Sequence, residues 1–178
     1  MGDFEEEIKQ VELPPKLPQK YCIVYSYYNR IHKKEEIEAI RNFCKEKGLE
    51  IVAIGAPQKW IKKYIVMDPF QVLAAFQNAE FVITDTFHGT IFASKYNGRF
   101  ATIVRESNRN KLTDLIYRIG VQDHMVSDIS ELDIAWKAQD SKQKVNNICK
   151  IERDRTLKYL ENAINRSVIK ILNNKGVY

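Results

Sequence analysis

The chain has 178 residues, a net charge of +5 and a hydrophobic share of 44%. This length fits one domain, and this composition is ordinary for a protein that buries one core, which argues against disorder for most of the chain. Its longest apolar runs, such as residues 81–83, are too short to cross a bilayer, and its acidic start is unlike a secretory signal. We therefore expect no transmembrane segment and a cytoplasmic location.

Charge is distributed unevenly along the sequence. Residues 1–12 hold five acids and one lysine, a net charge of −4, so the remaining 166 residues carry +9. A basic body suggests an anionic partner, although scattered solubilising lysines would give the same balance. The sequence contains no RNP-type aromatic motif, no zinc finger and no long basic run, so nucleic acid is not the expected partner.

The three cysteines, Cys22, Cys44 and Cys149, are odd in number and far apart. They form no C-x-x-C pair of the kind that binds zinc or carries redox chemistry. We read Cys22 and Cys44 as reduced core residues, because both fall in apolar periodic segments. No metal site is expected.

Residues 1–19 are predicted to be a leader and linker that precede the domain. Leu13 is followed by three prolines within residues 14–18, and such a segment neither continues a helix nor enters the interior of a sheet. The folded unit is therefore predicted to span residues 20–178.

From residue 20 onward, short strands alternate with helical stretches. Runs rich in β-branched and aromatic residues predict strands at 21–27, 50–54, 64–67, 81–84 and 100–104. Apolar residues at helical spacing predict helices at 34–47, after Asp68-Pro69, and at 90–96 and 111–119, several of them ended by glycine. Residues 141–172 follow a helical pattern, predicted as two helices or one bent helix, whose apolar positions are Leu157, Leu160, Ile164, Val168 and Ile171.

This alternation predicts an α/β fold. Right-handed crossovers would give an open, mostly parallel sheet of order 3-2-1-4-5 with helices on both faces and a long C-terminal helical segment. In such a sheet, ligands bind outside the carboxyl ends of the strands where the strand order reverses. The segment from Thr84 to Thr90 lies at such an end.

The loop after the fourth predicted strand contains the candidate catalytic residues Asp85 and His88. Gly89 would let a ligand approach the backbone, and Thr90 would present a free N–H group at a helix start, so the loop could cradle an anion. His88 could then donate a hydrogen bond or a proton to that anion. Asp85 could hold one imidazole nitrogen of His88, or could simply cap the helix.

Two arginines are the candidate anion ligands on the facing loops. Arg30 follows the first strand and Arg105 follows the fifth, and a guanidinium group can grip a carboxylate or phosphate through two hydrogen bonds. An exposed loop arginine with no such role is the alternative for each. His32 and His124 are assigned structural roles.

The segment 79–104, which includes AEFVITDTFHGTIF and FATIV, closely resembles the polysaccharide pyruvyl transferase family. It is similar to that family's A-D-F-V-I-T-D-S-F-H-G-T-x-F signature and the strand that follows. The segment 110–123 is similar to the next helix and an L-G-x-x-D-R turn, although His124 stands where arginine is common. The resemblance covers roughly residues 20–172 and is specific mainly across 79–123.

The resemblance implies two Rossmann-like halves arranged as in GT-B glycosyltransferases, with residues 20–178 similar to the C-terminal half. It implies transfer of pyruvate from phosphoenolpyruvate, a substrate rather than a cofactor, onto two sugar hydroxyls as a ketal. His88 matches the family histidine. The implied partners are phosphoenolpyruvate, a sugar or lipid-linked oligosaccharide acceptor in surface or exopolysaccharide biosynthesis, and an N-terminal domain of the same protein. Without that domain, we expect little or no transferase activity.

Two other functions remain open at the level of sequence. A GT-B glycosyltransferase domain would bind a nucleotide-sugar diphosphate at the same loop, and Glu106 is the obvious acid for its ribose hydroxyls. A non-catalytic assembly domain would act through the long C-terminal helical segment. Peripheral contact with the inner membrane face is also left open.

Overall fold

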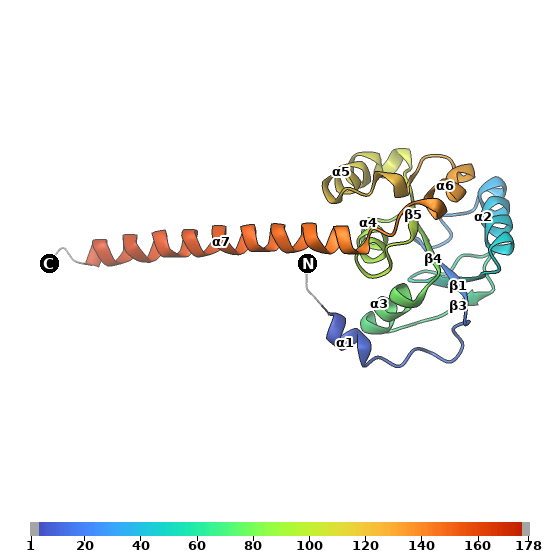
Figure 1. Ribbon diagram of the computed structural model, residues 1–178, viewed down its shortest axis with the longest axis horizontal. Coiled ribbons are helices and arrows are strands. Elements are labelled where there is room, and N and C mark those ends of the chain that lie inside the picture. The colour runs from blue at the N-terminus through green and yellow to red at the C-terminus, as the bar shows by residue number, and fades with distance from the viewer. Residues whose placement is uncertain (1–3, 176–178) are drawn as a thin grey trace.

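In the computed structural model, which describes the backbone of residues 4–175 and side chains as far as residue 166, the strands form one open parallel sheet (Figure 1). Its order is β3-β2-β1-β4-β5-β6, which confirms the predicted α/β fold and the predicted order of five strands. The sixth strand was not predicted, because two residues are too few to show a strand pattern in the sequence. The strands are β1 (Tyr21–Tyr25), β2 (Glu50–Ile54), β3 (Lys63–Tyr64), β4 (Phe81–Thr84), β5 (Phe100–Ile103) and β6 (Met125–Val126).

The central strands are buried on both faces, which explains why their sequences are almost continuously apolar. Successive side chains point to opposite faces: Tyr21 and Ile23 of β1 join one hydrophobic cluster, whereas Cys22 and Val24 join the other. Burial of Cys22 and Cys44 in the second cluster agrees with their assignment as free core cysteines.

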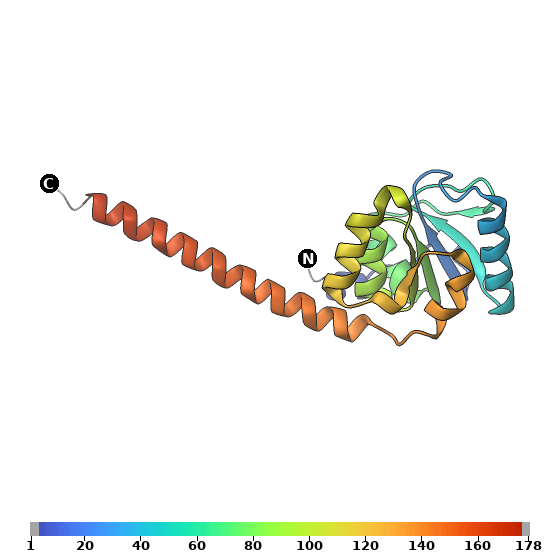
Figure 2. The same cartoon turned by 90° about the horizontal axis from the view of Figure 1, so that it is seen from above.

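Helices cover both faces of the sheet (Figures 1 and 2). One face packs against α3 (Pro69–Asn78), α4 (Phe87–Phe92), α5 (Arg109–Ile119) and the first turns of α7 (Lys142–Lys175). The other packs against α2 (Lys34–Glu46) and α6 (Leu132–Lys137). The sheet therefore lies between two helical layers, and its carboxyl edge is left to the connecting loops.

At two helices, the side chain of the N-cap residue determines where the helix begins. Asp68 caps α3 as predicted, and it forms a reciprocal capping box with Gln71. Helix α4 begins at Phe87, three residues earlier than predicted, because the hydroxyl of Thr86 caps it by accepting from the N–H of Gly89. A π-helical turn, Ala93–Asn97, follows α4 directly.

The N-terminal segment packs against the domain. Residues Glu5–Lys9 form a short helix, α1, whose Ile8 is 3% exposed and joins the core cluster on the α3 side of the sheet. Val11, Leu13 and Leu17 pack against the same cluster. Residues 1–19 were predicted to be a leader and linker, but residues within this segment contribute apolar side chains to the core. The proline-rich composition did not indicate this packing.

Helix α7 is one continuous helix rather than two, and it extends far beyond the sheet (Figures 1 and 2). Val145 in its first turn is buried in the core, whereas residues 151–166 are exposed. Among the exposed residues are Leu157, Leu160 and Ile164; Val168 and Ile171 lie outside the described side chains. Within residues 4–175, no helix combines the length and the apolar composition that a membrane span requires.

His124 is a structural residue between β5 and β6. It is 2% exposed, its ring stacks on Phe100 with 4.3 Å between centroids, and its Nδ1 lies 2.9 Å from the carbonyl oxygen of Phe100. Burial lowers the pKa of His124 below its usual 6.5, although hydrogen bonds to the backbone of Phe100 and Gln139 act in the opposite direction.

This environment predicts a pH dependence of stability. The unfolded chain takes up a proton on His124 near pH 6.5, before the folded protein does, so the free energy of unfolding should fall as the pH drops below that value. His124→Gln should lose this part of the pH dependence, as measured by urea unfolding at about pH 7.5 and about pH 5. The exposed His32→Gln should keep the wild-type dependence. An unchanged pH dependence in His124→Gln would contradict the assignment.

Candidate functional site

The candidate site lies at the carboxyl edge of the sheet, where the strand order reverses. After β1 the chain moves outward through β2 and β3, and it then returns to place β4 on the other side of β1. The loops after β1 and β4 therefore face each other, as at ligand sites of other open parallel sheets. In Figure 2 the loops after β1 and β2 arch over this edge, at the top of the view.

A buried carboxylate, that of Asp85, is the centre of this edge. The residue is 1% exposed, and its Oδ1 accepts a hydrogen bond of 2.6 Å from the hydroxyl of Ser26. Its Oδ2 lies 2.8 Å from Nε of Arg105 and 3.2 Å from Nε of Arg30. One carboxylate oxygen is thus shared by two guanidinium groups, which come from the loops after β5 and β1.

Arg105 is held from several sides. Its Nη1 donates to Oε1 of Glu36, in the first turn of α2, at 2.7 Å. Its backbone N–H donates to Asn108, whose side-chain amide in turn donates to the carbonyl oxygen of Asp85. Burial alone would lower the pKa of Arg105, but the hydrogen bonds to Glu36 and Asp85 outweigh it and raise the pKa. Arg105 is therefore a fixed cation.

Arg30 is the more accessible of the two arginines. Its Nη2 donates to the hydroxyl of Ser107 at 2.8 Å, and its guanidinium lies over the ring of Tyr27, 5.5 Å from the centroid. The side chain is 26% exposed, compared with 18% for Arg105. The structure thus brings both predicted anion ligands to the site, but each is already paired with Asp85.

Asp85 takes neither of the two roles that its position suggested. Its carboxylate is occupied by Ser26 and the arginines, and the cap of α4 is Thr86. His88 is exposed and makes no hydrogen bond with the described residues; its ring contacts are with Phe87 and Phe92. The orientation of the imidazole is therefore set by aromatic neighbours and not by Asp85.

Gly89 and Thr90 are buried structural residues of α4. The N–H of Gly89 donates to Oγ1 of Thr86 and the N–H of Thr90 to the carbonyl of Thr86, so neither is available to an anion. The hydroxyl of Thr90 also binds that carbonyl and lies 3.1 Å from the hydroxyl of Thr102. Helix α4 begins at Phe87, and the N–H groups of Gly89 and Thr90 are already bonded. The first-turn N–H groups that remain for a ligand are therefore those of Phe87 and His88.

A small open cavity of about 200 Å³ lies beside His88. It is bounded by the strand ends of β1 and β2 and by the start of α4, and its lining consists of Tyr25, Ser26, Tyr27, Gly55, Ala56, Thr86 and His88. Sequence reasoning placed His88 here but missed Ser26 and Gly55. Gly55 directly follows the predicted strand 50–54, whereas Ser26 fell inside the predicted strand 21–27, which ends at Tyr25 in the structure. Within the part of the chain that the structure describes, no cluster of His, Cys, Asp and Glu could hold a metal ion.

The first prediction from this geometry concerns Gly89. A Cβ at this position would lie closer than 3.0 Å to Oγ1 of Thr84, Oγ1 of Thr86 and the ring of Tyr25. Gly89→Ala should therefore destabilise the protein by about 1–3 kcal/mol through overpacking, although alanine normally favours a helix. Urea unfolding checks this. A stabilised variant would show that the glycine is not required for packing.

The second prediction concerns the shared carboxylate. Asp85→Asn keeps the side-chain shape but removes the carboxylate charge paired with Arg30 and leaves Arg105 with Glu36 as its remaining carboxylate partner, which should destabilise the fold by about 3–5 kcal/mol. Asp114→Asn is the control, because Asp114 forms an exposed pair with Arg118, and its unfolding midpoint should match the wild type. Equal midpoints for Asp85→Asn and Asp114→Asn would refute a central role for Asp85.

Comparison with known proteins places this site in a family. Residues 11–107 match the family model described as Polysaccharide pyruvyl transferase, and no curated protein matches the chain. The matched segment is more than half of the chain, runs from before β1 to beyond β5, and includes Arg30, Asp85, His88 and Arg105. The chain therefore belongs to the polysaccharide pyruvyl transferase family.

Proposed function

We propose that the chain is the phosphoenolpyruvate-binding domain of a polysaccharide pyruvyl transferase, acting in the cytoplasm in surface or exopolysaccharide biosynthesis. One observation carries the proposal: within the family-matching segment, an exposed histidine with no hydrogen-bond partner among the described residues lies at a cavity where the strand order reverses. Family membership supports the transferase class, and the cavity supports a small ligand at this place.

The reaction transfers a three-carbon unit to two hydroxyls of a sugar. Protonation at C3 of phosphoenolpyruvate turns its methylene into a methyl group and makes C2 electrophilic. One hydroxyl oxygen adds to C2 and releases its proton; the bond from C2 to the phosphate oxygen then breaks, the second hydroxyl oxygen bonds to C2, and its proton passes to the departing phosphate. The products are a cyclic ketal and inorganic phosphate. The step needs a proton donor near C3 and groups that stabilise the carboxylate and phosphate.

In this proposal His88 either donates the proton to C3 or donates a hydrogen bond to the phosphoenolpyruvate anion. Its exposed imidazole lies on the cavity, and an imidazole can act both as a hydrogen-bond donor and as a general acid. The N–H groups of Phe87 and His88, at the first turn of α4, supply further donors. Arg30 is the cation best placed to turn toward the ligand, since its side chain is partly exposed and borders Tyr27.

Asp85 and Arg105 act in this proposal by positioning. Asp85 restrains Arg30 and Arg105, while Gly89 and Thr90 fix the start of α4 so that His88 stays on the cavity. The acceptor is a sugar or a lipid-linked oligosaccharide, whose hydroxyls must approach C2 from the open side of the cavity.

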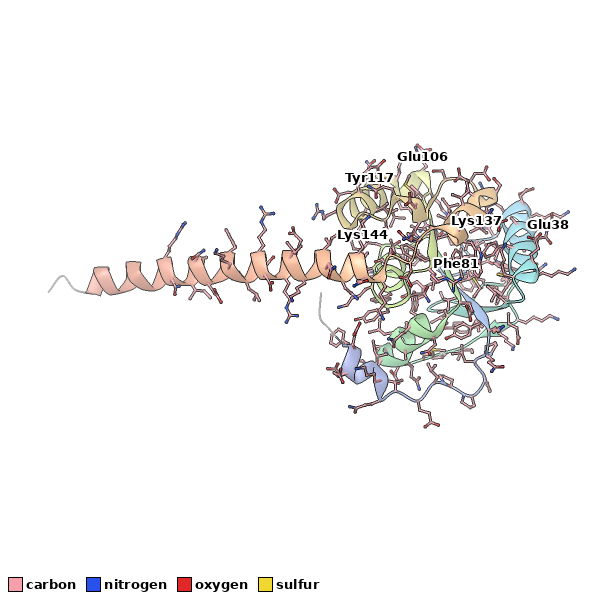
Figure 3. The ribbon with its side chains drawn as sticks, in the orientation of Figure 1. Glu38, Phe81, Glu106, Tyr117, Lys137 and Lys144 are labelled. Carbon is pink, nitrogen blue, oxygen red and sulfur yellow. The ribbon has the colours of Figure 1, made fainter. Side chains whose placement is uncertain are left out.

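The nucleotide-sugar alternative gains no support from Glu106. This residue lies in the short 3-10 turn Glu106–Asn108 after β5, is exposed, and stands at the outer edge of the molecule (Figure 3). It does not line the cavity beside His88. A carboxylate placed there is unsuited to hold ribose hydroxyls of a nucleotide bound in that cavity.

A thermal-shift experiment on the full chain tests the proposal. Phosphoenolpyruvate at about one hundred times its dissociation constant should add about 2.7 kcal/mol to the free energy of unfolding. UDP and GDP, tested in parallel, should add little. Stabilisation by a nucleoside diphosphate alone would favour the glycosyltransferase function, and stabilisation by none of the three would favour a non-catalytic assembly domain.

His88→Ala should abolish the stabilisation by phosphoenolpyruvate and leave the melting temperature of the free protein nearly unchanged, because the imidazole is exposed. His32→Ala removes a comparable exposed imidazole whose Nδ1 is 3.0 Å from the carbonyl of Arg30, and it should retain the stabilisation. If His88→Ala responded to phosphoenolpyruvate like the wild type, His88 would not be a ligand of the donor.

A further inference from the structure

Two consecutive tyrosines are exposed on the loop after β1, and the first of them borders the cavity beside His88. Tyr27 is 57% exposed and Tyr28 is 64% exposed, and Tyr27 also lines the cavity beside His88. Single exposed aromatic residues are common on protein surfaces and need no explanation. The surroundings of this pair set it apart, because the loop that presents the two rings is held in place by buried groups.

Gln58, from the loop after β2, fixes both ends of the tyrosine loop. This glutamine is 1% exposed; its Nε2 donates to the carbonyl of Tyr27 at 2.8 Å, and its Oε1 accepts from the N–H of Ile31 at 3.3 Å. The N–H of Asn29 also donates to the carbonyl of Pro57. A buried amide that bridges two loops costs desolvation unless it is fully bonded, so these bonds give the loop one conformation.

The backbone of the same loop is strained. Asn29 has φ of 44°, and it is the one non-glycine residue with positive φ in the described part of the chain. The turn is closed by the N–H of Arg30, which donates to the carbonyl of Tyr27 at 3.1 Å. A non-glycine residue in this region persists only where the surrounding structure holds it, and such strain is concentrated at ligand sites.

The two rings differ in what they contact. The guanidinium of Arg30 lies over the ring of Tyr27, whereas Tyr28 contacts no aromatic ring or cation among residues 4–166. The structure thus presents two exposed rings on a loop held in one conformation, and one of them, Tyr27, lines the same cavity as His88. Tyrosine suits such a surface, because it supplies a large contact area with few rotatable bonds.

We propose that Tyr27 and Tyr28 form the platform on which the sugar ring of the acceptor lies. The C–H face of a pyranose packs against an aromatic face, while its hydroxyls project from the edges of the ring and remain free to react. An acceptor must bring two hydroxyls to C2 of a donor held at His88, and the platform borders that cavity through Tyr27. That the bound sugar is the acceptor rests on the proposed function. The proposed contact between a sugar and the two tyrosines does not depend on that function.

Saturation-transfer NMR on the full chain tests the platform, with methyl β-galactopyranoside and methyl α-mannopyranoside as probes and uridine monophosphate as a competing aromatic ligand. The wild type should transfer saturation to ring C–H protons of at least one glycoside. Tyr28→Ala should reduce this transfer at least fivefold, and Tyr28→Phe should retain most of it. The matched control is Tyr159→Ala, which removes a tyrosine 73% exposed on α7 and should behave like the wild type.

The platform is refuted if neither glycoside receives saturation from the wild type, if Tyr28→Ala equals the wild type, or if uridine monophosphate displaces both glycosides. Retention by Tyr28→Phe separates loss of the ring from loss of the fold. Phosphoenolpyruvate stabilisation of the wild type is measured separately by thermal shift. Its absence, together with intact glycoside contact, would overturn the donor assignment and leave the tyrosine platform standing.

Discussion

The buried carboxylate of Asp85 ties together the loops after β1, β4 and β5 at the carboxyl edge of the sheet. Loops at this edge lack the repeating main-chain hydrogen bonds of paired strands, so side chains contribute much of what fixes their arrangement. Asp85 does so by joining its own loop after β4 to Ser26 and Arg30 after β1 and to Arg105 after β5. A charge placed in a low-dielectric interior is tolerated only when it is paired, and here the pairing also determines where the neighbouring loops lie.

Within the short segment that follows Asp85, most residues are buried and structural, and one side chain is exposed to a ligand. Thr86 caps α4, Gly89 allows the helix to approach β1 and β4, and Thr90 bonds back to Thr86, so all three are buried. His88, between them, is exposed at the cavity. The opposite wall is fixed in the same manner, because the buried Gln58 holds the loop that presents Tyr27 and Tyr28. Rigid walls with a few accessible side chains are the general form of small-ligand sites.

Much of the fold could be predicted because its signals are local. The apolar runs of β1, β4 and β5, the Asp68-Pro69 start of α3 and the Gly120 end of α5 each depend on neighbouring residues. Parallel sheets with helical crossovers allow few topologies, so the strand order followed from the alternation. The two-residue β6 and the packing of Ile8 could not be predicted in this way, since a short strand has no period and a helix of five residues is stabilised by its contacts with α3.

The sequence by itself determined which loop carries the candidate chemistry, because His88 follows a strand and precedes a helix whatever the distant contacts are. Only the tertiary structure decided the partner of each polar group. Asp85 pairs with Ser26, 59 residues away, and Arg105 pairs with Glu36, 69 residues away, rather than with any neighbour in the chain. Charges and hydrogen bonds depend on distance in space, and residues far apart in sequence meet at the sheet edge only after the strands have paired.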